Sequence, residues 1–215
     1  MKGFSIIPDI DIREMEEFLI PNGEYILPHY NELKCFTTEQ LVKFGYTYAM
    51  YTLPTIELIE TLHKMTVNSD TIEIGSGNGI IAKELNIRAT DNYCQELSEV
   101  KTYYNLLKQP IIEYGKNVVK IDAETIAKKL KPDIILGSWI THKYDYSLKS
   151  GNAYGPNEEI ILDNCKTYIM LGNEATHDIK PIRKHEHKKY HDFNGYITRS
   201  IQPEKNCVYI WKGRL

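Results

Sequence analysis

An acid followed by a run of glycines gives the chain a candidate ligand-binding turn. Residues 71–79 read Thr-Ile-Glu-Ile-Gly-Ser-Gly-Asn-Gly, which places Glu73 two residues before Gly75. The β-branched residues before the turn predict a strand, and the amphipathic stretch 80–85 after it predicts a helix. Glycines permit a sharp turn and let a ligand approach the main chain. Strand, glycine turn and helix in this order predict a phosphate or nucleoside site at the carboxyl edge of an α/β sheet. A turn that only reverses the chain is the alternative.

Two further acids follow the next two predicted strands. Asp91 ends the strand expected over 87–91, 18 residues after Glu73. A carboxylate at that place can accept hydrogen bonds from both hydroxyls of a ribose. Asp122 lies at the exit of the next strand, which is expected over 117–123. Each aspartate could instead cap the helix that follows it.

The glycine spacing differs from that of dinucleotide-binding proteins. Their fingerprint is Gly-x-Gly-x-x-Gly. Here Gly75, Gly77 and Gly79 alternate, and Ile80 occupies the position of the third glycine of that fingerprint. The spacing therefore favours a ligand other than a nicotinamide dinucleotide.

The hydrophobic pattern divides the chain into a helical N-terminal part and a sheet domain. Residues 1–66 predict a helical cap or lid, in which Thr37 and Gln40 have the spacing of a capping box. Residues 67–215 predict one compact α/β unit. Strands are expected at 71–74, 87–91, 117–123, 131–139, 166–172, 194–202 and 207–212. The last two would form an antiparallel hairpin.

The exit of the fourth predicted strand brings candidate reactive side chains to the same edge of the sheet. Ser138, Trp139 and His142 follow the aliphatic run of that strand, and a loop over 140–156 comes next. The length and the glycine and tyrosine content of this loop suit contact with a substrate. His142 could act as a general base because the unperturbed pKa of histidine is near 6.5. An incidental loop histidine is the alternative.

The order of these features resembles that of class I S-adenosylmethionine (SAM) dependent methyltransferases. The resemblance covers about residues 45–215 and is carried by Glu73, Gly75, Gly77, Gly79, Asp91, Asp122 and the strand Pro132–Trp139. It implies a Rossmann-like, seven-stranded, mostly parallel α/β sheet with helices on both faces, a terminal antiparallel β-hairpin and an N-terminal helical cap. It also implies SAM as the cofactor.

The resemblance assigns roles on both sides of the reacting methyl group. Glu73 would lie beside the methionine end of SAM, Asp91 would bind the ribose and Asp122 the adenine amine. The full set of expected cofactor contacts is Tyr51, Glu73, Gly75, Ser76, Gly77, Asn78, Asp91, Asn92, Asp122, Ala123 and Ser138. Tyr51 belongs to a tyrosine-rich segment whose rings could face the sulfonium or could pack between helices. The candidates on the substrate side are Ser138, Trp139 and His142.

The chain looks more closely like a poorly characterised group of methyltransferase-like proteins. Tyr46–Ala49 and Leu136–Trp139 match two segments of that group, but Ile140 and Thr141 replace its Pro-Pro pair. Enzymes that methylate the amino groups of adenine, cytosine or glutamine also carry Pro-Pro here. The methyl acceptor is therefore unassigned. A non-catalytic protein that binds SAM or a nucleotide is the alternative function.

Charge and composition limit the partners, metals and compartment. The net charge is −3, yet nine Lys/Arg and three Asp/Glu from Lys180 onward leave that segment at +6. This basic segment could contact nucleic acid, or it could be a solvated hairpin. The three histidines between His185 and His191 are flanked by lysines, which repel a cation, so no metal is expected. Four cysteines without a Cys-x-x-Cys pair, and the absence of a long apolar run, predict a cytoplasmic protein with no membrane contact.

Overall fold

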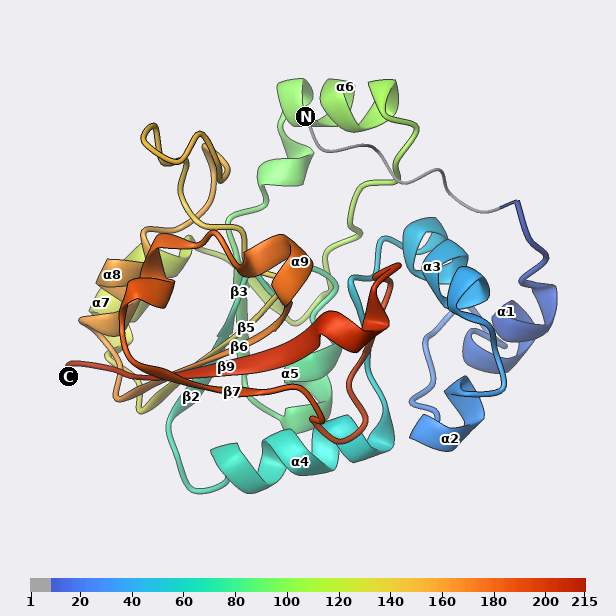
Figure 1. The fold of residues 1–215 in the computed structure, drawn as a ribbon, viewed down its shortest axis with the longest axis horizontal. Coiled ribbons are helices and arrows are strands. Elements are labelled where there is room, and N and C mark those ends of the chain that lie inside the picture. The colour runs from blue at the N-terminus through green and yellow to red at the C-terminus, as the bar shows by residue number, and fades with distance from the viewer. Residues whose placement is uncertain (1–8) are drawn as a thin grey trace.

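The computed structural model describes residues 9–215 and shows a seven-stranded sheet with helices on both faces (Figure 1). From one edge to the other, the strand order is β4, β3, β2, β5, β6, β9, β7. In that order the bounds are Val118–Lys120, Arg88–Asp91, Thr71–Ile74, Ile134–Ser138, Thr167–Asn173, Asn206–Lys212 and His187–Tyr190. The first five strands are mutually parallel, and β9 runs antiparallel to both of its neighbours. The predicted fold class is confirmed.

The strand order reverses beside β2. The chain runs outward through β3 and β4 and then returns to the other side of β2 with β5 and β6. In open α/β sheets, ligands bind outside the carboxyl ends of the strands at such a reversal. The antiparallel last strand, β9, is the feature expected of a class I methyltransferase fold. The topology therefore places a ligand site at the carboxyl ends of β2 and β5.

Helices cover both faces of the sheet. The helices on the two faces are α4 (Ile56–Thr66), α5 (Ile80–Leu85), α7 (Ala123–Leu130) and α8 (Glu158–Leu162). Two further helices, α6 (Ser98–Leu106) and α9 (Glu174–His177), follow β3 and β6 along the chain. α4 and α5 pack on one face in a cluster that contains Leu62 and Leu136. α7 and α8 pack on the other face in a cluster that contains Ile126 and Ile135 (Figure 1). Within residues 9–215, no helix has the length and apolar character needed to cross a bilayer.

Three short helices form a group at the N-terminal end of the chain. α1 (Arg13–Leu19), α2 (Tyr30–Leu33) and α3 (Thr38–Thr47) share one hydrophobic cluster, and Figure 1 shows them together beside the sheet. Thr37 begins α3 with the expected reciprocal capping box. Residues 1–8 of the predicted cap lie outside the described residues. The division of the chain into a cap and a sheet domain stays a proposal.

Counted along the chain, the sixth strand of the seven-stranded sheet lies earlier in the sequence than predicted. β7 spans His187–Tyr190, and the predicted strand at 194–202 is wrong. Within that range, β8 (Ile197–Thr198) pairs with β1 (Thr52–Leu53) in a second, two-stranded sheet. β7 is an edge strand whose residues are largely exposed. Polar edge strands lack the alternating apolar pattern that identifies strands in a sequence.

Candidate functional site

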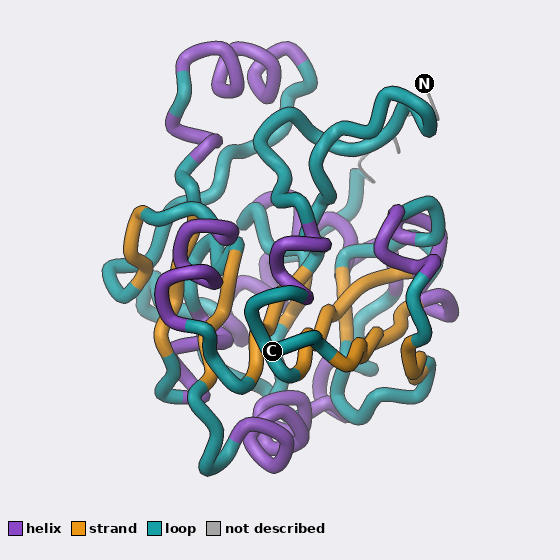
Figure 2. Tube along the Cα trace, turned by 90° about the vertical axis from the view of Figure 1, so that its left-hand side faces the viewer, coloured by secondary structure: helices purple, strands orange, loops and turns teal. Residues whose placement is uncertain are grey.

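The carboxyl edge of the sheet opens into a cavity of about 890 Å³. Its wall is formed by the carboxyl ends of β2, β3 and β5, by the segment that contains α6, and by the loop 140–156. α6 stands above the sheet in Figures 1 and 2. Eight predicted site residues line the cavity: Tyr51, Gly75, Asp91, Asn92, Asp122, Ala123, Ser138 and Trp139. The fold thus brings five separate segments of the chain to one cavity.

The turn after β2 requires glycine for its backbone conformation. Gly75, Gly77 and Gly79 have φ angles of 58°, 54° and 69°, in the left-handed region that other residues rarely adopt. A Cβ atom on Gly79 would lie 2.6 Å from Cγ2 of Val118. Gly75 is exposed and lines the cavity. Its main chain is therefore open to close approach by a ligand.

The remaining predicted residues of the turn hold its shape. The hydroxyl of Ser76 donates to the carbonyl oxygen of Glu73 at 3.1 Å, and Oδ1 of Asn78 accepts the N–H of Ile80 at 3.2 Å. The N–H of Gly77 donates to a carboxylate of the neighbouring strand at 3.0 Å. The residues that line the cavity do not include Ser76, Gly77 or Asn78. Their contacts with a cofactor stay predictions.

Asp91 presents a fixed carboxylate to the cavity. The residue is 8% exposed. Its Oδ1 accepts the N–H of Tyr93 at 2.9 Å, and its Oδ2 accepts the N–H of Gly77 at 3.0 Å. Burial raises the pKa of Asp91, although these main-chain hydrogen bonds oppose the shift. Each carboxylate oxygen can accept more than one hydrogen bond. Asp91 can therefore also accept hydrogen bonds from ligand hydroxyls.

Glu73 occupies a different environment from Asp91. It is 1% exposed, and its Oε2 accepts the N–H of Ala82 in α5 at 3.1 Å. Burial raises the pKa of Glu73 to about 8, so the carboxyl group is mainly protonated at neutral pH. Glu73 is not among the cavity-lining residues. The structure shows it joining β2 to α5, and a contact with SAM stays a prediction.

Asp122 caps a helix and also lies in the cavity wall, and its contact with adenine stays a prediction. It is the N-cap of α7, where its Oδ1 accepts the N–H of Thr125 at 2.9 Å. It also lines the cavity together with Ala123. Since one oxygen is sufficient for the cap, the other remains available to a ligand donor.

Tyr51 forms one wall of the cavity through a stacked arrangement. The guanidinium of Arg199 lies 3.6 Å from the ring centroid of Tyr51 and 4.3 Å from that of Tyr46. The rings of Tyr51 and Trp139 are 5.6 Å apart. Arg199 therefore occupies one face of Tyr51 and fixes the ring beside Trp139.

His177 is a cavity residue that sequence reasoning missed. It ends α9, directly after β6, and is 2% exposed. Its Nδ1 lies 2.9 Å from the main-chain nitrogen of Asn173, and its ring meets Trp139 edge-on with centroids 5.2 Å apart. Burial lowers the pKa of His177 to about 3, so the ring is neutral at physiological pH. The one available signal was its place just after the strand that pairs with β5.

His142 is not brought to the same cavity. The residue is 6% exposed, and its Nε2 lies 3.2 Å from the hydroxyl of Ser150. It lines a smaller cavity of about 400 Å³, together with Glu158 and Lys184. Burial lowers the pKa of His142, and the charge of Lys180 lowers it further. The residues that face Trp139 therefore include His177 and not His142.

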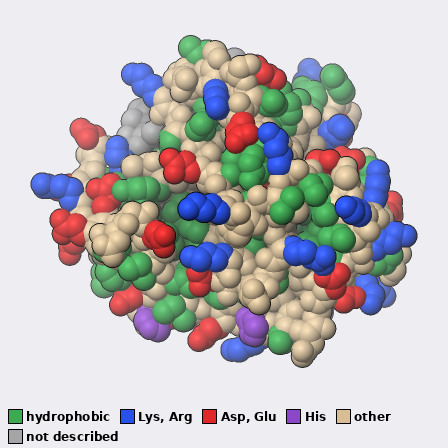
Figure 3. All heavy atoms as spheres, turned by 180° about the vertical axis from the view of Figure 1, so that it is seen from behind, with side chains coloured by type: hydrophobic (Ala, Val, Ile, Leu, Met, Phe, Trp, Pro, Cys, Tyr) green, Lys and Arg blue, Asp and Glu red, His purple; other side chains and the backbone are tan. Residues whose placement is uncertain are grey.

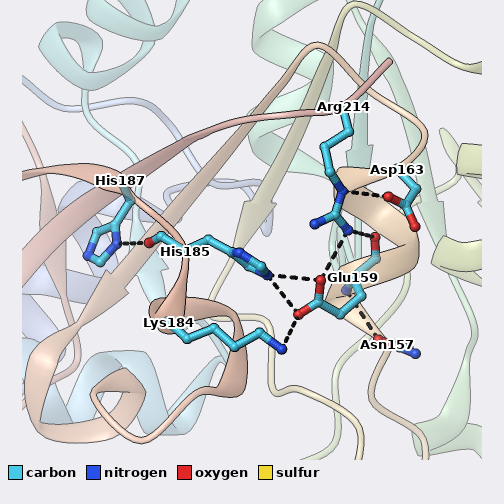
Figure 4. A network of polar contacts seen from close by, with 7 residues as sticks. All are labelled: Asn157, Glu159, Asp163, Lys184, His185, His187 and Arg214. Carbon is cyan, nitrogen blue, oxygen red and sulfur yellow. Dashed lines mark hydrogen bonds and ion pairs between the residues drawn. The ribbon is translucent and has the colours of Figure 1, made fainter.

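The histidines after residue 184 take part in hydrogen bonds. Nε2 of His185 contacts both carboxylate oxygens of Glu159 at 2.9 Å, and Lys184 and Arg214 contact the same carboxylate (Figure 4). Nδ1 of His187 lies 2.8 Å from the carbonyl oxygen of His185. Within the part of the chain that the structure describes, no group of three or more His, Cys, Asp or Glu side chains could hold a metal ion.

Comparisons with known proteins give distant structural neighbours. Neither a protein-family model nor a curated protein matches the chain. An rRNA methylase from Streptococcus thermophilus aligns over 74% of this chain and 95% of its own, at 12% identity and a TM-score of 0.39. A ribosomal protein L11 methylase from Lactobacillus delbrueckii subsp. bulgaricus aligns over 73% and 77%, at 13% identity and a TM-score of 0.34. The bifunctional kinase-methyltransferase WbdD aligns over 73% of this chain but only 37% of its own, at 9% identity and a TM-score of 0.42.

These neighbours are too distant to transfer an activity, so the strand order carries the assignment of the fold. The order of the five parallel strands reverses beside β2, and the last strand, β9, runs antiparallel between β6 and β7. The chain has the class I methyltransferase fold.

Proposed function

We propose that the protein binds SAM in the large cavity and transfers its methyl group to an acceptor beside Trp139. The observation that carries the proposal is the position of Asp91. Its rigid, partly free carboxylate lies in the cavity wall, next to the glycine turn and at the reversal of strand order. This is where an α/β sheet can hold a ribose.

The donors and acceptors around the cavity fit SAM. Asp91 would accept hydrogen bonds from the ribose hydroxyls, and Asp122 would accept one from the adenine amine. The exposed main chain of Gly75 would allow the methionine part to approach. Among residues 9–215, the cavity wall has four carboxylates and one lysine: Asp91, Glu99, Asp122, Glu124 and Lys143. Such a wall suits a cationic cofactor and opposes an anionic one.

Bound SAM supplies a methyl group that its sulfonium already activates. The task of the chain is then to align an acceptor and exclude water. Trp139 and the neutral ring of His177 would orient the acceptor, since both line the cavity at the ends of β5 and β6. Ser138 lies beside them, and its hydroxyl is 2.8 Å from that of Thr52. The β5 exit is thereby joined to the segment that carries Tyr51.

A nucleic-acid acceptor gains little support from the basic C-terminal segment. Ion pairs within the fold occupy Lys180, Arg183, Lys184, Lys189 and Arg214. Phosphate contacts would have to compete with these pairs. If the protein binds nucleic acid, it should shift the mobility of labelled RNA or DNA, and the shift should weaken as salt is added. The absence of a shift at low salt would exclude that class of acceptor.

The experiment that tests the proposal is calorimetric titration of the protein with SAM and with S-adenosylhomocysteine. We expect binding by the wild type and at least tenfold weaker binding by Asp91→Ala, about the effect of removing a hydrogen bond to a charged group. Asp192→Ala, which changes an exposed aspartate outside the cavity, should bind like the wild type. No binding by folded wild type would refute SAM as the ligand. Binding without methyl transfer to any acceptor would favour the non-catalytic alternative.

A further inference from the structure

One tyrosine joins the two walls at the mouth of the cavity. The hydroxyl of Tyr154, in the loop 140–156, donates to Oε1 of Glu99 on α6 at 2.8 Å. The carbonyl oxygen of Tyr154 accepts the Nδ2–H of Asn92 at 2.8 Å. All three residues line the cavity. The first hydrogen bond therefore joins the loop to α6, and the second joins it to the residue that follows β3.

The loop is the firmly held wall. Asp145 and Ser150 exchange main-chain hydrogen bonds of 2.8 and 3.3 Å, and the N–H of Lys143 donates to the carbonyl oxygen of Pro156 at 2.8 Å. These bonds join the two halves of the loop 140–156 to each other. Tyr154 is thus presented from a segment with its own internal support.

α6 is the weakly held wall. None of its residues is buried, and its Leu106 is 78% exposed. Figures 1 and 2 show the helix standing away from the sheet. Segments with few buried apolar contacts open locally at a low cost in free energy. An additional hydrogen bond from the loop can therefore decide how often α6 is open.

We propose that Tyr154 is a latch that holds α6 closed over bound cofactor through its hydrogen bond to Glu99. The proposal rests on the proposed function, because the retained ligand is SAM or its demethylated product. Opening of the latch would let the product leave, and closure would exclude water from the reacting methyl group. Tyr154 acts here through Glu99 and is a positioning residue.

The chemistry of the pair suits a latch that forms and breaks. A hydrogen bond from Glu99's own main chain lowers the pKa of its carboxyl group, and the hydroxyl of Tyr154 lowers it further. The acceptor is therefore a carboxylate, and hydrogen bonds to charged acceptors are stronger than neutral ones. Because both side chains lie at the surface, water can replace either partner when the latch opens.

The test is stopped-flow measurement of the rate at which S-adenosylhomocysteine dissociates. Tyr154→Phe and Glu99→Ala should each raise this rate about two- to tenfold, the effect of one hydrogen bond. The double variant should match the faster single variant, since both changes remove the same interaction. Tyr144→Phe is the matched control, because this tyrosine lies in the same loop but does not line the large cavity. The melting temperature should stay unchanged in all four variants.

A dissociation rate that Tyr154→Phe leaves unchanged would overturn the latch, and so would multiplicative effects in the double variant. Absence of SAM binding by the wild type would refute the proposed function instead. In that case, hydrogen exchange of α6 in the free protein tests whether Tyr154 holds the helix closed. Faster exchange in Tyr154→Phe than in Tyr144→Phe would support the latch, and equal exchange would overturn it.

Discussion

The two ends of the cavity are built in different ways. At the glycine-turn end, the key hydrogen bond joins Gly77, in the turn after β2, to Asp91 at the end of β3, 14 residues later in the chain. At the proposed acceptor end, Trp139 meets His177 from α9, the helix that follows the adjacent strand, and a buried ion pair between Lys180 and Glu158 supports that region. The first end depends on a local motif. The second depends on contacts that form only after the sheet has assembled.

The ion pair is connected to the loop 140–156. Nζ of Lys180 lies 2.7 Å from Oε1 of Glu158, and the two side chains are 1% and 2% exposed. Lys180 also donates to the carbonyl oxygen of Ile140 at 2.7 Å, and Glu158 accepts the hydroxyl of Tyr168 at 2.9 Å. Ile140 begins the loop 140–156, and Glu158 begins α8 shortly after the loop ends. A single buried ammonium therefore holds both ends of the loop.

Breaking this pair should have the largest effect on stability. Lys180→Met leaves the carboxylate of Glu158 buried without its cation, which costs about 3–5 kcal/mol in the free energy of unfolding. Urea denaturation measures the change. Lys188→Met, on the exposed edge strand β7, should change the value by about 0.5 kcal/mol or less. Lys180→Met combined with Glu158→Gln should be more stable than Lys180→Met alone. A loss below about 1 kcal/mol in the single variant would mean that the acceptor end does not depend on this pair.

Glu73 should make the glycine-turn end sensitive to pH. Burial raises its pKa from 4.5 to about 8 in the folded protein. The folded state therefore keeps a proton that the unfolded state releases, and the free energy of unfolding falls as pH rises between these values. In the wild type this effect should lower the free energy of unfolding by about 3.5 kcal/mol between pH 5 and pH 8, with a slope of at most about 1.4 kcal/mol per pH unit, and Glu73→Gln should remove it.

Urea denaturation of wild type and Glu73→Gln across that range tests the prediction. Glu204→Gln, which changes an exposed glutamate, should keep the pH profile of the wild type. Identical slopes for wild type and Glu73→Gln would show that Glu73 is ionised in the folded protein. Glu73 would then not differ from Asp91 in its protonation state.

Glu159, the neighbour of Glu158 in α8, should have the smallest effect. Partial burial raises its pKa, but Lys184, His185 and Arg214 outweigh that effect and lower it to about 2 (Figure 4). Its stabilising contribution is present above pH 4.5 and is lost as pH falls toward 2. Because the side chain is 33% exposed, Glu159→Gln should cost less than about 1 kcal/mol at pH 7.

Thermal and urea unfolding at pH 7 and pH 3 check this prediction. The difference between wild type and Glu159→Gln should shrink at the lower pH. A cost equal to that of Lys180→Met would contradict the contrast between buried and exposed pairs. Figure 3 shows how closely positive and negative side chains are mixed over one face of the molecule, which is the setting in which single surface pairs contribute little.

Local patterns were sufficient to predict six of the seven strands of the sheet and its glycine turn. β-Branched runs marked the first five strands of the sheet, and the positive φ angles of Gly75, Gly77 and Gly79 explain why that turn could be recognised. Asp91 and Asp122 were found because the carboxyl ends of neighbouring parallel strands share one edge. Strand β7 was missed because an exposed edge strand carries no apolar alternation.

The sequence by itself determined the class of fold and the acids at the edge of the sheet, since these depend on residues near one another in the chain. Only the tertiary structure separated Asp91, in the cavity wall, from Glu73, buried against α5. It also brought His177 into contact with Trp139 and placed His142 in the wall of another cavity. The physical reason is that burial and the pairing of distant side chains follow from packing between elements, which no local pattern encodes.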